Sequence, residues 1–202
     1  MTEKPRSGDA PRILRTLFKD SAEYVWSLRP LFLICLILFF FSSVASFYLG
    51  DTLSDELPEE FQGLLQFIED LSLPFLFLFI VFNNILNSFV WMVLGVALGV
   101  PPLYFIVRNG FMIGRVIYST SLEAGLPLTV ALLLPHGIIE IPSILLSAAA
   151  GMSLGYQLIN RFRGIGSLRA ELGRALNLFI WKIAPLLFIA AVVEVLLIGA
   201  FI

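Results

Sequence analysis

Few side chains in this sequence can take part in chemistry, and most of those lie inside apolar segments. The stretch 134–142, Leu-Pro-His-Gly-Ile-Ile-Glu-Ile-Pro, holds a histidine and a carboxylate four residues apart, His136 and Glu140. That spacing puts both side chains on one face of a helix. Three interpretations are open: a polar bracket that joins helices, a site that handles protons or ions, and a metal site. His136 is the sole histidine, so a zinc site would need three oxygen ligands, and we expect no metal.

A group of amides lies upstream of this stretch. Asn83 and Asn87 are spaced i, i+4 and share one helix face, and Asn84 follows Asn83 directly. Amides inside a membrane join helices through hydrogen bonds worth about 0.6–2 kcal/mol, or they line a polar pathway. Asn109 follows a pair of prolines, and Glu194 lies within the last apolar segment. We treat all of these, with His136 and Glu140, as candidate intramembrane polar or functional residues.

No complete catalytic set accompanies these residues. Gly151-Met152-Ser153-Leu154-Gly155 matches the G-x-S-x-G nucleophile elbow, but that motif needs a strand–turn–helix context, and the preceding alanines favour continuous helix. The only candidate base, His136, precedes Ser153 by roughly 25 Å along a helix. The sequence shows no phosphate loop or dinucleotide fingerprint. We therefore expect no enzyme, no catalytic residue and no cofactor. Nucleic acid is not expected as a partner either, because the basic residues lie where lipid headgroups would be.

The elements that position these residues are predicted to be membrane helices. Of 202 residues, 58% are hydrophobic and 14% are charged, whereas a soluble domain is about a quarter charged. That surplus of apolar surface predicts an all-α, polytopic helix bundle in a lipid bilayer, built as one domain over 1–202. Runs of about twenty apolar residues predict five transmembrane helices, at 31–49, 74–94, 95–118, 126–152 and 178–202.

Two of these five helices are expected to be interrupted. Pro101-Pro102 removes two backbone donors from the third helix, which also carries two arginines. A pair of half-helices that re-enters the membrane is one form that this element can take. The two prolines and the glycine of 134–142 predict a kink or a break in the fourth helix.

Charge is distributed unevenly along the chain. Residues 1–30 carry six Lys or Arg, residues 51–70 carry seven acids and no Lys or Arg, and residues 161–174 carry four arginines. Cytoplasmic loops collect Lys and Arg, so we expect a cytoplasmic N-terminus and a C-terminus outside. Apolar stripes at helical spacing predict amphipathic helices that lie on the membrane surface or pack on the bundle. They fall in the cytoplasmic arm 1–30, the acidic outer loop 51–73 and the basic cytoplasmic segment 156–176.

Glycines at helical spacing complete the pattern. Small residues at i, i+4 let two helix backbones approach closely, so three such pairs predict a tightly packed bundle or a homodimer. Cys35 is the only cysteine, which rules out a disulfide within the chain. The helix-packing pairs are Gly95 and Gly99, Gly110 and Gly114, and Gly151 and Gly155.

The order of these motifs resembles the stage II sporulation protein M family. The resemblance covers roughly residues 75–156, and it implies a polytopic protein without known catalytic activity. In spore-forming bacteria the family member anchors and organises two cell-wall hydrolases during engulfment, and homologues also occur in bacteria and archaea that make no spores. The motifs that carry it are Asn83-Asn84, Gly95, Gly99, Pro102, Asn109-Gly110, Gly114, Pro135-His136-Gly137, Glu140, Pro142 and Gly151.

Two functions are compatible with these observations. The first is a non-enzymatic membrane scaffold that recruits partner membrane or extracytoplasmic proteins, with the acidic loop 51–73 and the segment 156–176 as docking surfaces. The alternative is a dimeric transporter or channel-like protein that uses the polar residues around Asn83, His136 and Glu140, because transporters build their sites at broken helices.

Overall fold

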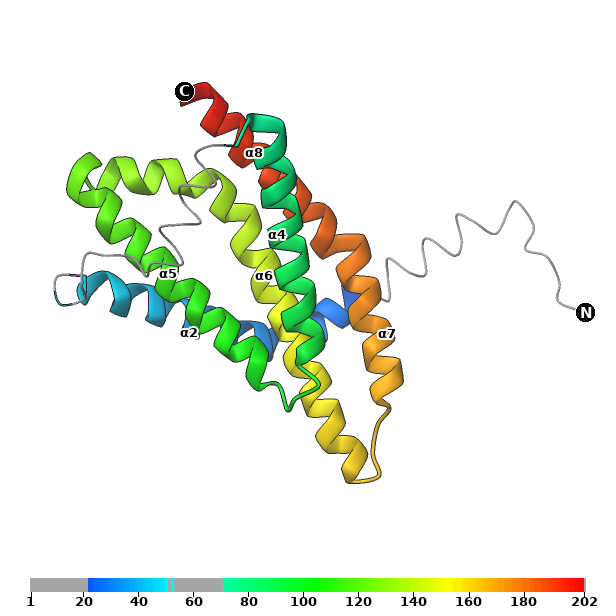
Figure 1. Cartoon of the computed structure of the whole chain (residues 1–202). Helices are drawn as coiled ribbons and strands as arrows, with labels where there is room; N and C mark the ends of the chain where they lie inside the picture. Colours follow the sequence, from blue (N-terminus) through cyan, green and yellow to red (C-terminus); the bar gives the residue numbers. More distant parts are fainter. Residues whose placement is uncertain (1–21, 51, 53–70, 202) are drawn as a thin grey trace, which may run out of the picture.

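The computed structural model describes residues 22–50, 52 and 71–201, and every regular element in that part of the chain is helical (Figure 1). The all-α membrane bundle predicted from composition is therefore confirmed. A short helical stretch over 22–27 precedes the main elements. These elements are α2 (Arg29–Tyr48), α4 (Leu73–Leu94), α5 (Val100–Ala124), α6 (Leu126–Phe162), α7 (Leu168–Leu178), the π-helical turn η1 (Phe179–Ile183) and α8 (Ala184–Phe201).

Four stretches of the described chain are long and apolar enough to cross a membrane. They are Arg29–Tyr48, Leu73–Leu94, Gly137–Phe162 and Leu168–Gly199. The third of the five predicted spans, 95–118, does not qualify because α5 is more polar than its neighbours and carries Arg108 and Arg115. At 25 residues and 1.5 Å per residue, α5 is about 37 Å long, which still exceeds the thickness of a hydrocarbon core.

The helix α5 is a single continuous helix, so the expectation of re-entrant half-helices is wrong. The chain breaks just before it, where Leu98 and Gly99 both adopt a left-handed conformation. Pro101 and Pro102 then occupy the first turn of α5. Proline is tolerated there because the first N–H groups of a helix have no partner within the helix. The prolines therefore start a helix where the sequence pattern suggested that they would interrupt one.

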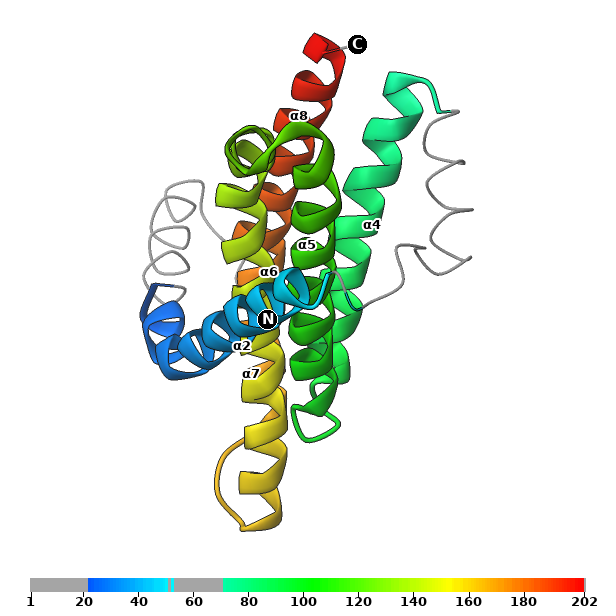
Figure 2. The ribbon, with the colours of Figure 1, turned by 90° about the vertical axis from the view of Figure 1, so that its left-hand side faces the viewer.

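The helices α4, α5, α6 and α8 run alternately up and down, and α2 lies across the outside of α5 and α6 (Figures 1 and 2). The helix α2 follows α5 in the same direction at backbone contact. A Cβ atom added to Gly110 would overlap the Phe39 carbonyl oxygen, and one added to Gly114 would overlap the Ser43 carbonyl oxygen. Glycine is required at these crossings because any side chain would push the two helices apart.

The turn between α4 and α5 packs equally closely on α6. A Cβ atom on Gly95 would overlap the carbonyl oxygen of Gly151, and one on Gly155 would overlap the backbone nitrogen of Gly99. Ser147 of α6 also donates a hydrogen bond of 2.8 Å to the Ser88 carbonyl oxygen of α4. Four of the glycines chosen from spacing alone thus lie at one junction of three elements.

The segment 156–176 differs from the single amphipathic helix expected there. Residues up to Phe162 belong to α6, a turn follows, and α7 runs back along α6 before continuing through η1 into α8. Gly164 and Gly166 adopt left-handed conformations in the turn, which glycine does without strain. Ser167 then caps α7 by accepting a hydrogen bond of 3.3 Å from the Ala170 N–H.

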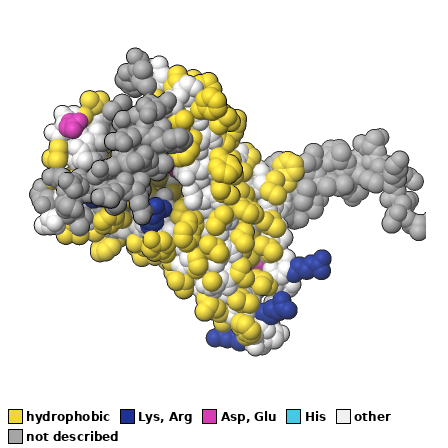
Figure 3. Space-filling view, in the orientation of Figure 1, with side chains coloured by type: hydrophobic (Ala, Val, Ile, Leu, Met, Phe, Trp, Pro, Cys, Tyr) yellow, Lys and Arg dark blue, Asp and Glu magenta, His cyan; other side chains and the backbone are white. Residues whose placement is uncertain are grey.

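The surface agrees with a lipid environment. In the view of Figure 3 most of the described surface is hydrophobic, and several Lys and Arg side chains lie at its lower end, around the turn between α6 and α7. On α2, Phe40 and Phe41 are 68% and 72% exposed, as expected for side chains that face acyl chains. The acidic loop 51–73 and the arm 1–30 fall largely outside the described residues.

Candidate functional site

A cavity lies beside a bend in α6. The first part of α6 runs at a steep angle to the rest (Figure 1), although its backbone remains helical through Pro135 and Pro142. Each proline lacks the N–H that would bond to the carbonyl four residues earlier, and its ring displaces that carbonyl. The kink predicted from 134–142 is therefore present as a bend without a break. The bend separates the upper part of α6 from α4 and α8.

The cavity beside this bend has a volume of about 690 Å³, within the range of about 300–1,000 Å³ that is typical of small-molecule sites. Its walls come from α2, α4, α5, α6 and α8, so nearly the whole bundle contributes to it. Its polar lining residues are Asn83, Asn84, Asn109, Glu140 and Glu194, and its apolar lining includes Phe39, Phe79, Ile80, Ile113, Ile117, Leu133, Leu134, Ile138 and Ile141.

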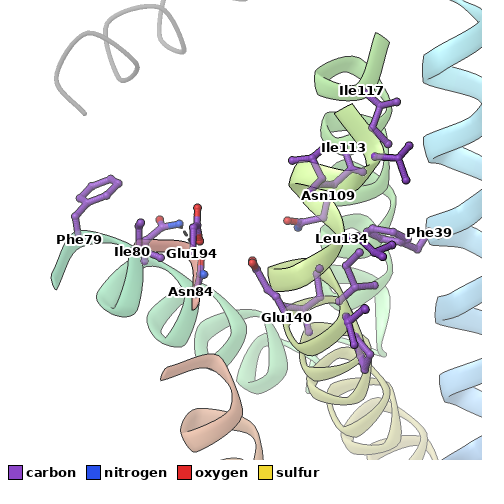
Figure 4. A pocket seen from close by; sticks show the side chains of 18 residues that line it. Phe39, Phe79, Ile80, Asn84, Asn109, Ile113, Ile117, Leu134, Glu140 and Glu194 are labelled. Atoms are coloured by element: carbon purple, nitrogen blue, oxygen red, sulfur yellow. Dashed lines mark hydrogen bonds between the residues drawn. The ribbon is translucent and has the colours of Figure 1, made fainter. Parts of the chain in front are cut away.

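The two carboxylates approach the cavity from opposite sides (Figure 4). Glu140 extends from α6, and Glu194 extends from α8 beside Asn84 of α4. Both glutamates are half-buried, and they lie close enough for their charges to repel each other. Two like charges in a medium of low dielectric are costly. Carboxylates in such a place therefore need partners, and both glutamates have further interactions in the bundle.

The amides form two separate groups around the cavity. Asn109 donates from its Nδ2 to the Phe105 carbonyl oxygen at 2.7 Å, within its own helix. On α4, Asn87 donates to the Asn83 Oδ1 at 2.7 Å, and Asn83 donates to the Asn84 Oδ1 at 3.4 Å. These bonds orient the amides along one side of α4. Asn87 itself is exposed and does not line the cavity.

Five of the seven polar residues singled out in the sequence therefore surround one cavity, and Asn87 does not line it. Asn87 contributes only through its bond to Asn83. The backbone of His136 lies in α6, but its side chain is outside what the structure describes, so its pairing with Glu140 stays a prediction. Among the described residues there is no group of three or more His, Cys, Asp or Glu that could hold a metal ion.

A second polar cluster was not predicted from the sequence. Glu171 of α7 is only 1% exposed, and three side chains donate to its carboxylate. The Tyr24 hydroxyl donates at 2.8 Å, Ser153 of α6 donates to the same oxygen, and Arg174 forms an ion pair with the other oxygen. We call these four residues the Glu171 cluster. It fastens the stretch 22–27 and α7 to the lower part of α6.

The electrostatics of this cluster keep the Tyr24 phenol protonated. Burial raises the pKa of Tyr24 well above its ordinary value, and the neighbouring Glu171 charge raises it further. Arg174 lies over the Tyr24 ring, with its guanidinium carbon 5.2 Å from the ring centroid, a cation–π arrangement. The one sequence signal of the cluster was an acid among four arginines. Two of the partners of Glu171, Tyr24 and Ser153, lie 147 and 18 residues away along the chain, beyond the reach of helical spacing.

The fold and cavity define a polytopic helical membrane protein with a polar site inside the bundle. Residues 15–197 match the sequence profile of the stage II sporulation protein M family, and the chain belongs to that family. The archaeon Methanocaldococcus jannaschii has two uncharacterised proteins similar to it. One is 37% identical over 87 residues, covering 43% of this chain and 49% of that protein. The other is 30% identical over 142 residues, covering 69% of this chain and 59% of that protein.

The chain thus spans between about half and three fifths of the length of these relatives. No solved structure matches the chain. The predicted membership of the family is therefore confirmed, and the two similar proteins from an archaeon are consistent with a family that also occurs outside spore-forming bacteria. The relatives carry no functional description that could be tested on the cavity.

Proposed function

We propose that this protein binds a small solute in the cavity between α4, α5, α6 and α8 and carries it across the membrane. The observation that supports this most directly is the location of the cavity. Asn83 lies roughly 15 Å along α4 from its first residue, at 1.5 Å per residue, which is close to the middle of the helix. Carboxylates inside transmembrane segments are rare and commonly mark the path of a substrate or an ion, and here two of them lie with three amides around one cavity.

The helix α8 supplies the element that can move. It carries Glu194 and meets α4 through side chains, such as the Phe77–Phe188 ring pair with centroids 5.5 Å apart. The turn η1 at its base is π-helical, and Pro185 is the second residue of α8. Such π-helical turns and prolines are the usual places where a helix bends. Bending there would change the separation of Glu194 from Glu140.

The charge distribution orients the protein in the membrane. Residues 161–174, with their four arginines, and the start of α2 lie at one end of the bundle, because Tyr24 contacts α7. The same end holds the turn between α4 and α5, which packs on Gly155. By the positive-inside rule this end is cytoplasmic. The N-terminus is then inside, and α8 runs outward.

Access from both sides of the membrane tests the transport proposal. Cysteine at Ile113, on the cavity wall, would be labelled with a charged, membrane-impermeant thiol reagent in right-side-out and in inverted vesicles. Each cysteine variant would also carry Cys35→Ala, so that the introduced cysteine is the one thiol that can react. Cys35 is fully buried, and alanine is small enough to replace it there. We expect Ile113→Cys to react from both sides, and lipid-facing Phe40→Cys to stay unlabelled. Glu123→Cys, exposed near the end of α5, is the water-accessible reference.

Each other result has a defined meaning. Reaction of Ile113→Cys from one side only would leave a binding site and remove transport from the proposal. Protection from both sides, while Glu123→Cys still reacts, would mean that water and solutes do not reach the cavity. In that case the transport proposal would be abandoned.

A membrane scaffold is the second candidate, and the glycine contacts favour it. The backbones of α2 and α5, and of the α4–α5 turn and α6, touch at Gly110, Gly114, Gly95 and Gly151. Contacts of this kind restrict the motion of one helix relative to another. A scaffold that binds partner proteins tolerates this restriction, whereas a transporter has to move its helices during transport. Deleting residues 55–70 from the acidic loop should then leave a folded protein that loses its partners on affinity purification. Recovery of the same partners with the deleted chain would count against the scaffold.

A further inference from the structure

A groove lies along α6, apart from the polar residues of the cavity. It has a volume of about 360 Å³ and lies between the start of α2 and α8, which both pack against α6. All but two of its described lining residues are apolar. Ser143 donates to the Ile139 carbonyl oxygen within its own helix, and Arg29 is the one charged residue of the described lining. The groove therefore offers a ligand a hydrocarbon surface and a positive charge.

Arg29 stands at the end of the groove that the charge distribution assigns to the cytoplasm. Tyr24 and Ser153 of α6 donate to the same carboxylate oxygen. The Cys35 Sγ of α2 lies 3.5 Å from the Met152 Sδ of α6. Because Arg29 comes between Tyr24 and Cys35 in the chain, it lies near the level of these two neighbouring residues of α6. The part of α6 that borders the groove lies farther outward.

The length of the groove fits an acyl chain of one leaflet. Along α6 the groove extends from Ile138 to Leu146, which is about 12 Å at 1.5 Å per residue. One leaflet contributes about 15 Å to a hydrocarbon core of about 30 Å. Leu186, which forms the wall on α8, is exposed, so the groove opens toward the surrounding lipid. A chain that enters from there can fill the groove along its length.

The surroundings of Arg29 suit a phosphate at the membrane surface. Its guanidinium group lies over the ring of Trp26, which is itself exposed. Tryptophan side chains are enriched at the level of the lipid headgroups. Stacking uses the face of the guanidinium and leaves N–H donors at its edge, where they match pairs of phosphate oxygens. An apolar groove alone would accept any lipid, whereas Arg29 favours a headgroup with a net negative charge.

We propose that this groove binds one anionic phospholipid of the cytoplasmic leaflet. Its phosphate would contact Arg29, and one of its acyl chains would lie along α6 between α2 and α8. The site goes beyond the proposed function, because the lipid can bind whether or not the protein transports a solute. Ile138 and Pro142 border both the groove and the cavity, so the bound chain would lie against the bend in α6.

Titration of lipids into the purified full-length protein tests this site. The protein is kept in a mild detergent, and native mass spectrometry counts the lipids bound at each concentration. The probes are dioleoyl phosphatidylglycerol and dioleoyl phosphatidylcholine, which share their acyl chains and differ in net charge, and methyl phosphate, which has no acyl chain. We expect one phosphatidylglycerol to bind at least tenfold more tightly than phosphatidylcholine, and methyl phosphate not to displace it.

Matched variants separate the headgroup contact from the chain contact. Arg29→Gln should abolish the preference for phosphatidylglycerol, and Arg29→Lys should retain part of it because the charge remains. Arg163→Gln removes an exposed arginine at the same end of the bundle, outside the groove, and should leave the preference unchanged. Leu186→Trp narrows the groove and should weaken binding of both lipids. Ile189→Trp, on an exposed position of the same helix outside the groove, should not. Circular dichroism of each variant checks that the fold is retained.

Four results would overturn the assignment. Equal affinity of the wild type for both lipids would mean that the groove does not recognise charge. An equal loss of preference in Arg29→Gln and Arg163→Gln would show attraction to the whole basic end of the protein. Equal weakening by Leu186→Trp and Ile189→Trp would place the acyl chain outside the groove. Displacement of phosphatidylglycerol by methyl phosphate at the concentration of the lipid would identify a site for free phosphate.

Discussion

Glu171 and Glu140 are both acidic side chains on helices of an apolar bundle, but they lie in opposite surroundings. The Glu171 carboxylate is buried and accepts from a tyrosine, a serine and an arginine at one end of the molecule. Glu140 faces an open cavity and a second carboxylate, Glu194, near the middle. A carboxylate that is enclosed by hydrogen-bond donors stabilises the fold. A carboxylate that faces a cavity is placed where it can contact a ligand.

The backbone follows the same division along α6. In its lower part, Gly151 and Gly155 touch the backbone of α4 and of the α4–α5 turn. In its upper part, Pro135 and Pro142 bend the helix away from its neighbours, and the cavity occupies the space. The lower part of α6 therefore packs closely against its neighbours, whereas the upper part lies farther from them and borders the cavity.

The largest contrast is expected between Glu171→Gln and Glu140→Gln. Glu171→Gln removes the ion pair with Arg174 and puts an amide N–H in place of the oxygen that accepts from the guanidinium, so it should reduce the free energy of unfolding by roughly 3 kcal/mol. Glu140→Gln removes one of two repelling charges and should cost less than about 1 kcal/mol. Reversible denaturation in mixed micelles, followed by tryptophan fluorescence, measures both. If both variants lose the same free energy of unfolding, Glu171 and Glu140 do not differ in how much they stabilise the fold, and the comparison fails.

Two glycine substitutions in α6 compare the packing of its halves. A Cβ atom on Gly151 would lie 2.8 Å from the Met92 carbonyl oxygen and 2.8 Å from Pro102 Cγ, so Gly151→Ala should destabilise the protein by about 1–3 kcal/mol. Among the described residues, a Cβ atom on Gly137, in the cavity wall, meets only Ile141 Cδ1 at 3.4 Å. Gly137→Ala should then be neutral or stabilise by up to about 1 kcal/mol. A thermal midpoint for Gly151→Ala at or above that of Gly137→Ala would contradict this account.

The Tyr24 hydroxyl gives the Glu171 cluster a pH dependence. Tyr24→Phe removes one hydrogen bond and should cost about 1 kcal/mol near neutral pH. The pKa of Tyr24 is raised in the folded protein, chiefly by burial, so its stabilisation is complete below the ordinary tyrosine pKa of about 10 and is lost as the pH rises further. The stability gap between wild type and Tyr24→Phe should therefore narrow above pH 10. A gap that widens with pH would mean that the phenolate is the form held in the fold.

Much of the fold could be predicted because it depends on local patterns. The apolar runs placed helices at 31–49 and 74–94, and the structure has Arg29–Tyr48 and Leu73–Leu94. The α6–α7 turn was missed, although its signal was present. Gly164 and Gly166 adopt conformations that favour glycine, and Ser167 is a good helix cap. The apolar stripe on both sides of that turn concealed the change in direction.

The candidate site was partly accessible to the same reasoning. An amide or carboxylate within an apolar run is conspicuous, so Asn83, Asn109, Glu140 and Glu194 could be chosen individually. Their arrangement around one cavity depends on which helices are neighbours, and a single sequence does not contain that information. Glu171 was overlooked because an acid beside arginines in an amphipathic stretch resembles a solvated side chain. Its burial depends on Tyr24 and Ser153, which distant parts of the chain provide.

The smallest expected effect lies at the boundary between the two halves of α6, where two buried serines differ only in their acceptors. Ser147 donates across to the Ser88 carbonyl oxygen of α4 at 2.8 Å, whereas Ser143 donates to Ile139 in its own helix at 2.7 Å. Ser147→Ala should cost about 0.6 kcal/mol, the average for such bonds between membrane helices. Ser143→Ala should cost nothing, because the Ile139 carbonyl lies within a helix that alanine favours. If the two variants unfold identically, then α4 and α6 are held at this level by backbone shape alone, and the glycine contacts below account for the whole junction.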